Sequence, residues 1–341
     1  MNDRILAGRH ARGWSQQELA DRAGVTRQLV GAVESGRHAP NVGAALALAR
    51  ALGTSVEDLF ADRPAVVIEP AVGEADPPEA LAATARVGDR LVGVAPVGHA
   101  VDPERWFVAD AVLGETGPEW LPGARTDGLV LAGCDPVLGM LADLVAAASP
   151  HRVLVAHAAT ERAIESLGRG TVHGAVVHGV GGRLPEVRSG VRRWRLAAWQ
   201  VGLAHFSDRG APSIDDLVDA GLVVVQREAG AGSQRALVRA LEAVGCHRLP
   251  PGPIADGHLD AVRRLRAGHA QAALTMEAAA IAHRLAFEPI EVHDVELWID
   301  ERWVDLPALG VLLETLTSAG FVRRVERIGG YELAGCGTRV P

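Results

Sequence analysis

The sequence predicts a multidomain fold: an all-α domain at the N-terminus, a small β-rich connector and an α/β domain of two lobes. Helix-capping residues recur in the first sixty residues, a stretch rich in Pro, Gly and acids follows at 62–80, and strand-like and helix-like segments alternate from Asp127 onward. A chain of 341 residues has room for two or three domains. We place the boundaries at 1–64 for the α domain, 65–80 for a linker, 81–125 for the connector and 126–341 for the α/β domain.

The composition is that of a globular protein, with 48% hydrophobic and 22% charged residues. No apolar run approaches the roughly 18 residues of a membrane span. The first residues have no apolar signal core, so we expect a cytoplasmic protein. The cysteines have no C-x-x-C spacing and predict neither a disulfide framework nor a Cys-rich zinc site; they are Cys134, Cys246 and Cys336. We expect no cofactor and no bound metal.

Charge is spread unevenly along the chain. Residues 1–64 hold eight arginines and seven acidic residues, whereas the whole chain has a net charge of −8. The acidic remainder does not favour binding to polyanions. Any contact with nucleic acid is therefore expected in the first domain.

Helix starts in the first domain are predicted from three capping signals. Ser15 and Glu18 have the spacing of a capping box, in which each side chain bonds the other residue's backbone N–H. Thr54 and Glu57 repeat this spacing, and Thr26 precedes a third helical stretch as an N-cap. Each signal marks the residue at which a helix is expected to begin.

A glycine turn joins two of these short helices. Residues 19–23 form one apolar helical stripe, Gly24 ends that helix, and residues 25–33 form the next stripe. Two short helices joined by a tight glycine turn are typical of a helix-turn-helix.

The segment SQQELADRAGVTRQLVGAVESGRHAP resembles the Cro/C1-type (XRE-family) helix-turn-helix domain, and the resemblance covers residues 4–60. It implies that the second helix of the motif lies in the major groove of double-stranded DNA. It also implies phosphate contacts from Gln16, Thr26 and Arg37, and base contacts from Arg27, Gln28 and Ala32. A near-neutral domain binds DNA weakly alone, so we expect a homodimer on a palindromic operator. The alternatives are a solvated helix face and a protein partner.

The connector is predicted from strand-like residues around a turn. Gly88-Asp89 lies between two short apolar runs, which is typical of a β-hairpin, and residues 105–114 offer a third strand. We expect this β-rich element to pack on the larger domain.

The α/β domain begins with a regular alternation. The strand-like runs GLVLAG, RVLVAH and HGAVVHG are separated by the helical runs DPVLGMLADLVAAA and ATERAIESLGRG. This order predicts a parallel sheet with crossover helices. Ligands of open α/β sheets bind at the carboxyl ends of the strands. Those ends are Gly133–Asp135, His157–Thr160 and His178–Gly179.

A second α/β unit follows an interruption at WRLAAWQVGLAHF, and VELWIDERWVDLPALGVLLETLTS returns as a strand and a helix. Two such lobes favour a cleft that closes on a small ligand, although two unrelated Rossmann-like domains would give the same periodicity. Residues 127–335 resemble the periplasmic-binding-protein-like (type II) domain related to molybdate-binding proteins, in the words AGCDPVLGML, QREAGAGSQRAL, HLDAVRRLRAGHAQAAL and IGGYELAGCG. The resemblance implies a ligand-sensing domain.

The strand-loop-helix around Gly230 and Gly232 is the predicted anion site. The glycines let the backbone approach a ligand, and the first N–H groups of the helix are free to bind an anion. Ser233 either caps the helix or donates its hydroxyl to the ligand, and Arg227 either supplies charge or pairs with Glu228. The third glycine of a dinucleotide fingerprint is absent. Glycines that serve only the turn are the alternative.

Departures from the molybdate-related family change the expected ligand. Cys134 stands where the family has a histidine, and residues 157–160 replace a Gly-Ser word, so Thr160 would have to supply the lost hydroxyl. The ligand is then an oxyanion such as molybdate, or an organic anion. Hydrogen bonds to it are expected from His157, His178 and His258 beside Asp135, with metal ligation as the less favoured alternative.

Together these features predict a one-component transcriptional regulator that binds DNA through its first domain and senses a small anionic ligand in an interlobe cleft. The alternative from another class is an enzyme, with Cys134 beside a histidine as the candidate nucleophile. The position of this cysteine at a helix start would lower the pKa of its thiol, but a small buried thiol is the more common outcome and is the one we expect. We expect a protein that is not an enzyme.

Overall fold

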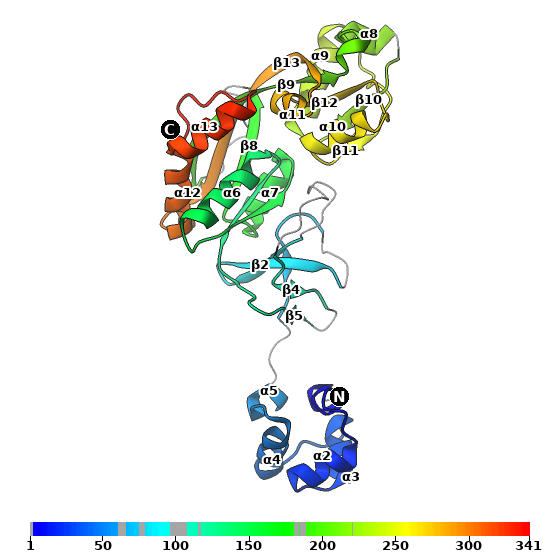
Figure 1. The fold of residues 1–341 in the computed structure, drawn as a ribbon, viewed down its shortest axis with the longest axis vertical. Coiled ribbons are helices and arrows are strands. Elements are labelled where there is room, and N and C mark those ends of the chain that lie inside the picture. The colour runs from blue at the N-terminus through cyan, green and yellow to red at the C-terminus, as the bar shows by residue number, and fades with distance from the viewer. Residues whose placement is uncertain are drawn as a thin grey trace. The chain divides into compact units, whose positions relative to one another are not determined.

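The computed structural model describes residues 3–60, 66–74, 79–95, 108–114, 117–180, 184, 189–219 and 221–341. The chain forms two compact units, Met1–Val66 and Val67–Pro341, and Figure 1 shows the elements of each. No helix in the described parts of the chain is long and apolar enough to span a membrane.

The first unit is all-α. In its described residues the helices are α1 (Asp3–His10), α2 (Gln16–Ala23), α3 (Arg27–Glu34), α4 (Val42–Leu52) and α5 (Val56–Phe60). All five of these helices contribute apolar side chains to one buried cluster, among them Ile5, Leu19, Val30, Leu48 and Leu59. The helices therefore share a single small core.

Local capping signals determine where these helices begin. Ser15 and Glu18 form the predicted capping box, with Ser15 Oγ accepting from the Glu18 N–H at 3.2 Å and the Glu18 carboxylate accepting from the Ser15 N–H at 2.6 Å. Thr26 caps α3 as predicted, and Gly24, at a φ of 66°, ends α2.

Two other helix starts differ from the sequence prediction. Helix α5 begins at Val56, one residue later than an N-cap at Thr54 would start it, and the side chain of Glu57 lies outside the described residues. Asn41 caps α4 through its side-chain oxygen, which accepts from the Ala44 N–H at 2.9 Å. Asparagine is a preferred N-cap residue, so this start also follows a local sequence signal.

The second unit begins with a five-stranded sheet in the order β1-β3-β2-β4-β5. Its strands are β1 (Glu69–Pro70), β2 (Leu81–Val87), β3 (Arg90–Val94), β4 (Ala111–Val112) and β5 (Glu119–Trp120). β2 and β3 form the predicted hairpin, with Gly88 in the turn at a φ of 62°. Of the predicted strand at 105–114, residues 111–112 are β4, and residues 105–107 lie outside the described residues. Strand β1 lies within the stretch predicted as a linker.

This small sheet packs on the α/β part of the unit. Val87 and Val92 share a buried cluster with Val130 and Trp298 of the larger sheet. The predicted packing of the connector on the larger domain is therefore confirmed.

A buried ion pair joins the two sheets. Arg152 Nη2 lies 3.0 Å from the Asp110 carboxylate, which also accepts from the backbone N–H groups of Thr84 and Arg125 at 2.7 and 2.8 Å. Asp110 is 1% exposed. Because a buried carboxylate needs such partners, this network fixes the connector on the α/β part.

The predicted alternation is confirmed in β6 (Leu129–Gly133), α6 (Val137–Ala148), β7 (Val153–His157), α7 (Thr160–Arg169) and β8 (Gly174–Val180). Strand β6 pairs in parallel with both β7 and β8, as crossover helices require. Two helices near the C-terminus, α12 (Pro307–Thr317) and α13 (Ala319–Ile328), lie beside α6 (Figure 1). We call these elements lobe 1.

Lobe 2 consists of β10 (Val224–Arg227), β11 (Ile254–Ala255), β12 (Ala272–Met276), α8 (Ile214–Asp219), α9 (Gly232–Ala243), α10 (His258–Arg266) and α11 (Glu277–Ala282). Strand β10 pairs in parallel with β11 and β12. Strand β10 ends at Arg227 and helix α9 begins at Gly232, so the structure contains the predicted strand-loop-helix around Gly230 and Gly232.

Two long antiparallel strands, β9 (Val191–His205) and β13 (Ala286–Asp300), run through both lobes (Figure 1). The sheet order is β11-β10-β12-β9-β13-β8-β6-β7. Strand β9 is the segment that interrupts the alternation, because an antiparallel strand that crosses between lobes needs no crossover helix. The short strand β14 (Arg339–Val340) pairs with β9, and 3-10 helices lie at Ser207–Arg209 and Glu301–Trp303.

Candidate functional site

The first unit presents an open groove of about 490 Å³, lined by Gln16, Arg27, Gln28, Gly31, Ala32 and Arg37. Five of the six residues predicted for DNA contact lie in this groove. The sixth, Thr26, uses its hydroxyl oxygen to cap α3, accepting from the Leu29 N–H at 3.2 Å. Arg27, Gln28 and Arg37 are exposed. The groove therefore offers exposed cationic and amide groups to a ligand.

A buried ion pair fixes α3 behind this groove. Arg9 Nε donates to Glu34 Oε1 at 2.7 Å, and Gln16 Nε2 donates to Glu34 Oε2 at 2.8 Å. Burial opposes ionisation of Glu34, but the hydrogen bonds from Arg9 and Gln16 hold its pKa below the usual value. One amide N–H of Gln16, which the resemblance assigns to a phosphate, is thus used inside the protein.

The second unit holds a buried group of polar side chains between its lobes, which we call the interlobe cluster: Cys134, His178, Arg227, Ser233 and His258. Each is at most 4% exposed. The first two come from lobe 1 and the other three from lobe 2. Cys134 Sγ lies 3.3 Å from His178 Nε2, and the rings of His178 and His258 are 6.0 Å apart.

Gly232 allows the lobes to approach at this cluster. A Cβ at Gly232 would lie 2.9 Å from Cε1 of His178, so a larger residue would force α9 away from lobe 1. A Cβ at Gly230 would meet only the end of the flexible Glu161 side chain, at 2.7 Å. Of the two glycines in the predicted loop, Gly232 is the one that close packing requires.

Several polar atoms of the interlobe cluster have no hydrogen bond to any described residue. They are Arg227 Nη1 and Nη2, Ser233 Oγ and His258 Nε2, and all of them are buried. Arg227 is held by its Nε, which donates to the Ala255 carbonyl at 3.2 Å. The Glu228 carboxylate is 3.9 Å from Arg227 Nη2, which is too long for a hydrogen bond. The guanidinium thus lacks an acceptor for two of its nitrogens.

Ser233 does not cap α9, although the sequence allowed that role. The N-cap position is Ala231, with no side-chain hydrogen bond, and Ser233 lies within the first turn. Its hydroxyl is therefore available to a ligand, which was the second predicted role.

The carboxylate of Asp135 accepts hydrogen bonds from other groups of the protein. It accepts from Trp199 Nε1 at 3.0 Å, from the Tyr331 hydroxyl at 2.7 Å and from the Val137 N–H at 3.0 Å. Three donors satisfy this buried group, so it supports α6 and β9 and has little capacity left for a ligand.

Two other predicted residues connect elements of the unit. His157 Nε2 lies 2.6 Å from the Asp256 carbonyl oxygen of lobe 2. Thr160 Oγ1 accepts from the His178 N–H at 3.3 Å and so supports strand β8. The structure therefore places both beside the interlobe cluster with contacts to protein groups.

Burial sets the protonation of these groups. Burial, followed by the charge of Arg227, lowers the pKa of His157 to about 4 and that of His258 well below its usual value. Burial raises the pKa of the Cys134 thiol to about 11. Loss of hydration is the largest cause, so Cys134 is the small buried thiol that we expected and not a nucleophile with a lowered pKa.

Two residues that the sequence analysis missed complete the cluster. His293 Nδ1 lies 2.8 Å from His178 Nδ1, and its Nε2 lies 2.6 Å from the Glu291 carboxylate. The Trp199 ring lies 4.6 Å from the His178 ring. His293 and Trp199 are register partners on β13 and β9, so strand pairing brings them together and no local motif marks them.

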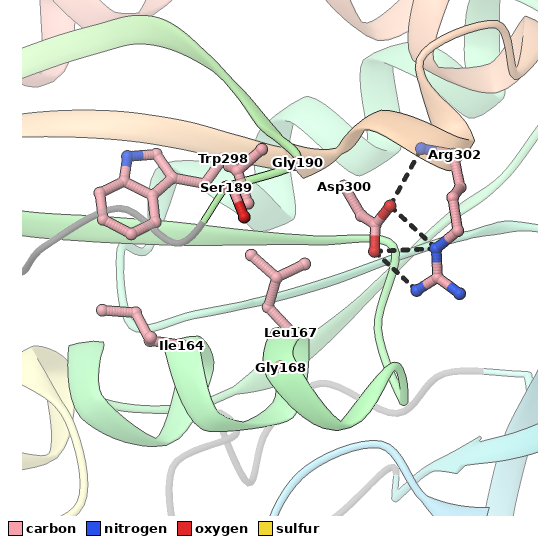
Figure 2. A pocket seen from close by; sticks show the side chains of 9 residues that line it. Ile164, Leu167, Gly168, Ser189, Gly190, Trp298, Asp300 and Arg302 are labelled. Atoms are coloured by element: carbon pink, nitrogen blue, oxygen red, sulfur yellow. Dashed lines mark hydrogen bonds and ion pairs between the residues drawn. The ribbon is translucent and has the colours of Figure 1, made fainter.

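A separate hollow of about 160 Å³ lies beside α7 and β13 (Figure 2), lined by Ile164, Leu167, Gly168, Ser189, Gly190, Val191, Trp298, Asp300 and Arg302. Arg302 Nη2 donates to the Asp300 carboxylate at 2.6 Å. Because these two charges pair with each other, we expect an ionic ligand to bind this hollow less readily than the interlobe cluster.

Comparison with known proteins identifies both units. Residues 142–317 match the PBP superfamily domain and residues 5–59 match the helix-turn-helix family. Over 61 residues, 18% of this chain and 88% of the relative, the chain is 46% identical to an uncharacterized HTH-type transcriptional regulator of Methanothermobacter thermautotrophicus. A second such regulator, from Bacillus subtilis, is 37% identical over 60 residues, 18% of this chain and 91% of the relative.

Among solved structures, the effector domain of the transcriptional regulator AmpR of Pseudomonas aeruginosa is similar to this chain. It matches with a TM-score of 0.42 at 16% sequence identity and covers 59% of this chain and 99% of that chain.

Proposed function

Because this chain belongs to the PBP superfamily and carries a helix-turn-helix domain, we propose that it is a one-component transcriptional regulator that senses a small anion. The main support for an anionic ligand is the guanidinium of Arg227. This residue is 2% exposed, and two of its nitrogens have no hydrogen bond among the described residues. Ser233 Oγ and the first N–H groups of α9 complete the proposed contacts. A carboxylate or oxyanion supplies the acceptors that these donors lack.

We propose that the groove of the first unit binds DNA, with Arg27 and Gln28 at base edges. Arg27→Ala and Gln28→Ala are each expected to weaken binding to the DNA upstream of the protein's own gene by about 1–3 kcal/mol. Fluorescence anisotropy measures this loss. Arg50→Ala is the matched control, because Arg50 is exposed on α4 outside the groove. Equal losses in all three variants would refute base contacts by α3.

The anion site is tested on chelator-treated full-length protein. Thermal shifts are recorded with molybdate, tungstate, phosphate and a set of carboxylates, because a ligand that binds only the folded state raises the melting temperature. Native mass spectrometry identifies any anion carried through purification. Arg227→Met and Ser233→Ala are expected to remove the shift that wild type shows, whereas Arg248→Met, at an exposed position in lobe 2, keeps it. Unchanged shifts in Arg227→Met would exclude this site.

The mechanism we propose is closure of the lobes on the anion, which changes the DNA affinity of a homodimer. A two-fold dimer places two copies of α3 on a palindromic operator. Light scattering is expected to give twice the chain mass of 35.7 kDa. A monomer at micromolar concentration that still binds DNA tightly would contradict this part of the proposal.

We propose further that the protein acts in the cytoplasm, where its operator is, and that it is not an enzyme. The relatives matched by the first unit are named transcriptional regulators. Incubation with the bound anion is expected to leave the anion's mass unchanged. Turnover that disappears in Cys134→Ser would instead favour an enzyme.

A further inference from the structure

We propose that Cys134, His178 and His258 form a binding site for a borderline transition-metal cation such as Zn²⁺. One ligating atom from each of these buried residues lies within 4.8 Å of the other two. Thiolate and imidazole are ligands that zinc prefers, whereas magnesium and calcium prefer oxygen. The inference goes beyond the anion site, because it needs neither a bound anion nor Arg227.

The hydrogen bonds around His178 determine which of its nitrogens is free. An ionised Glu291 carboxylate can only accept, so the contact of 2.6 Å to His293 Nε2 places the His293 proton on that nitrogen. His293 Nδ1 then carries a lone pair and accepts from His178 Nδ1 at 2.8 Å. His178 Nε2 therefore directs a lone pair at Cys134 Sγ, 3.3 Å away.

The same reasoning applies to His258. Thr275 Oγ1 donates its proton to the His258 carbonyl at 3.0 Å, so in its contact of 3.5 Å with His258 Nδ1 the nitrogen is the donor. His258 Nε2 then carries a lone pair, and it has no partner among the described residues. Each imidazole thus donates one N–H to a supporting group and keeps one lone pair, as metal-bound histidines do.

The spacing fits a tetrahedral site with one open position. Zinc–ligand bonds place a sulfur and a nitrogen about 3.6 Å apart, close to the 3.3 Å between Cys134 and His178. His258 needs to move inward by about 1 Å to complete the site. Binding releases the thiol proton to solvent. Because His258 belongs to lobe 2, the cation would join the two lobes.

Arg227 opposes a cation at this position, which gives the inference a distinctive test. The positive charge of Arg227 acts on both Cys134 and His258, so its repulsion of a cation bound between them is expected to weaken cation binding by about tenfold or more. Arg227→Met is therefore expected to tighten metal binding while it abolishes anion binding. Opposite effects of one substitution separate the two proposals.

The test is a titration of reduced, metal-free, full-length protein with Co²⁺ alone, followed by competition with Zn²⁺. One equivalent of Co²⁺ is expected to bind with a thiolate-to-cobalt absorption band and the intense visible bands of tetrahedral cobalt. Cys134→Ser is expected to lose the thiolate band, and His258→Gln to lose tight binding. The controls Cys336→Ser and His247→Ala are expected to keep both.

His293 is expected to act as a positioning residue. His293→Ala should weaken Co²⁺ binding by about 10–100-fold while the thiolate band stays. Circular dichroism verifies that each variant is folded. If His258→Gln does not fold, His258→Ala is used in its place. No thiolate band in wild type, or a band that Cys336→Ser removes and Cys134→Ser keeps, would overturn the site. Either result would leave the anion proposal intact, because that proposal is tested on protein from which a chelator has removed metal.

Discussion

Arg227→Met is expected to stabilise the unliganded protein even though it removes anion binding. The guanidinium is 2% exposed, and one nitrogen bonds the Ala255 carbonyl at 3.2 Å. The other two nitrogens have no hydrogen bond among the described residues, although Nη2 forms a long ion pair with Glu228 at 3.9 Å. A buried charged donor left without hydrogen bonds costs about 2–4 kcal/mol, and loss of the Ala255 bond and of the long ion pair with Glu228 offsets about 1 kcal/mol of the gain. The expected net gain is about 1–3 kcal/mol in the free energy of unfolding.

Differential scanning calorimetry of the ligand-free protein measures this gain. For a unit of this size, each kcal/mol raises the melting temperature by about 2–4 °C. Arg248→Met is the control for loss of an exposed arginine, and it should change the unfolding free energy by no more than about 0.5 kcal/mol. If Arg227→Met melts below wild type, the guanidinium has a stabilising partner in the free protein, and the argument for a missing anion fails.

Three further substitutions test other parts of the structure. Gly232→Ala places a Cβ 2.9 Å from His178 and should weaken anion binding by about tenfold. Gly310→Ala is the control, because a Cβ there meets nothing within 4 Å and should not change anion binding. Equal anion affinities of the two variants would show that the lobes adapt to the added methyl group. Glu34→Gln leaves Arg9 buried without its charge partner, so urea denaturation of the first unit should show a loss of about 3–5 kcal/mol. Because the pKa of Glu34 is held below its unfolded value, this stabilisation is present at neutral pH and disappears as the pH falls through the folded pKa; a pH-independent difference between wild type and variant would contradict this assignment. Asp110→Asn removes the charge partner of Arg152 and should lower the melting temperature of the second unit, and an unchanged melting curve would mean that the network adds no stability.

Features that depend on neighbouring residues could be predicted from the sequence. The capping box of Ser15 and Glu18 and the hairpin turn at Gly88 involve residues only a few positions apart. The alternation of strands and helices also located the strand ends that supply Cys134 and His178. The resemblance also predicted residues that line the groove of the first unit, and the structure brings five of them together.

Features that depend on distant residues could not be predicted. His293 and Trp199 lie within two strands of 15 residues each, and only the register of β13 against β9 brings them to the cluster. Asp135 is at a strand end, as ligand-binding residues often are, but Tyr331, 196 positions away in the sequence, donates to its carboxylate. The absence of hydrogen bonds to two nitrogens of Arg227 likewise depends on where distant acceptors of the described residues lie, which no local pattern indicates.

The most direct test of a regulator that senses an anion is the linkage between anion and DNA. Anisotropy titrations of the upstream DNA are run with and without the anion identified by the thermal-shift experiment, for wild type and Arg227→Met. Saturating anion is expected to change the DNA affinity of wild type by about 5–150-fold, and saturating DNA to change the anion affinity by the same factor. Arg227→Met should bind DNA with an affinity that the anion does not alter. If wild type binds both ligands and neither affects the other, the two units act independently, and the central claim is wrong.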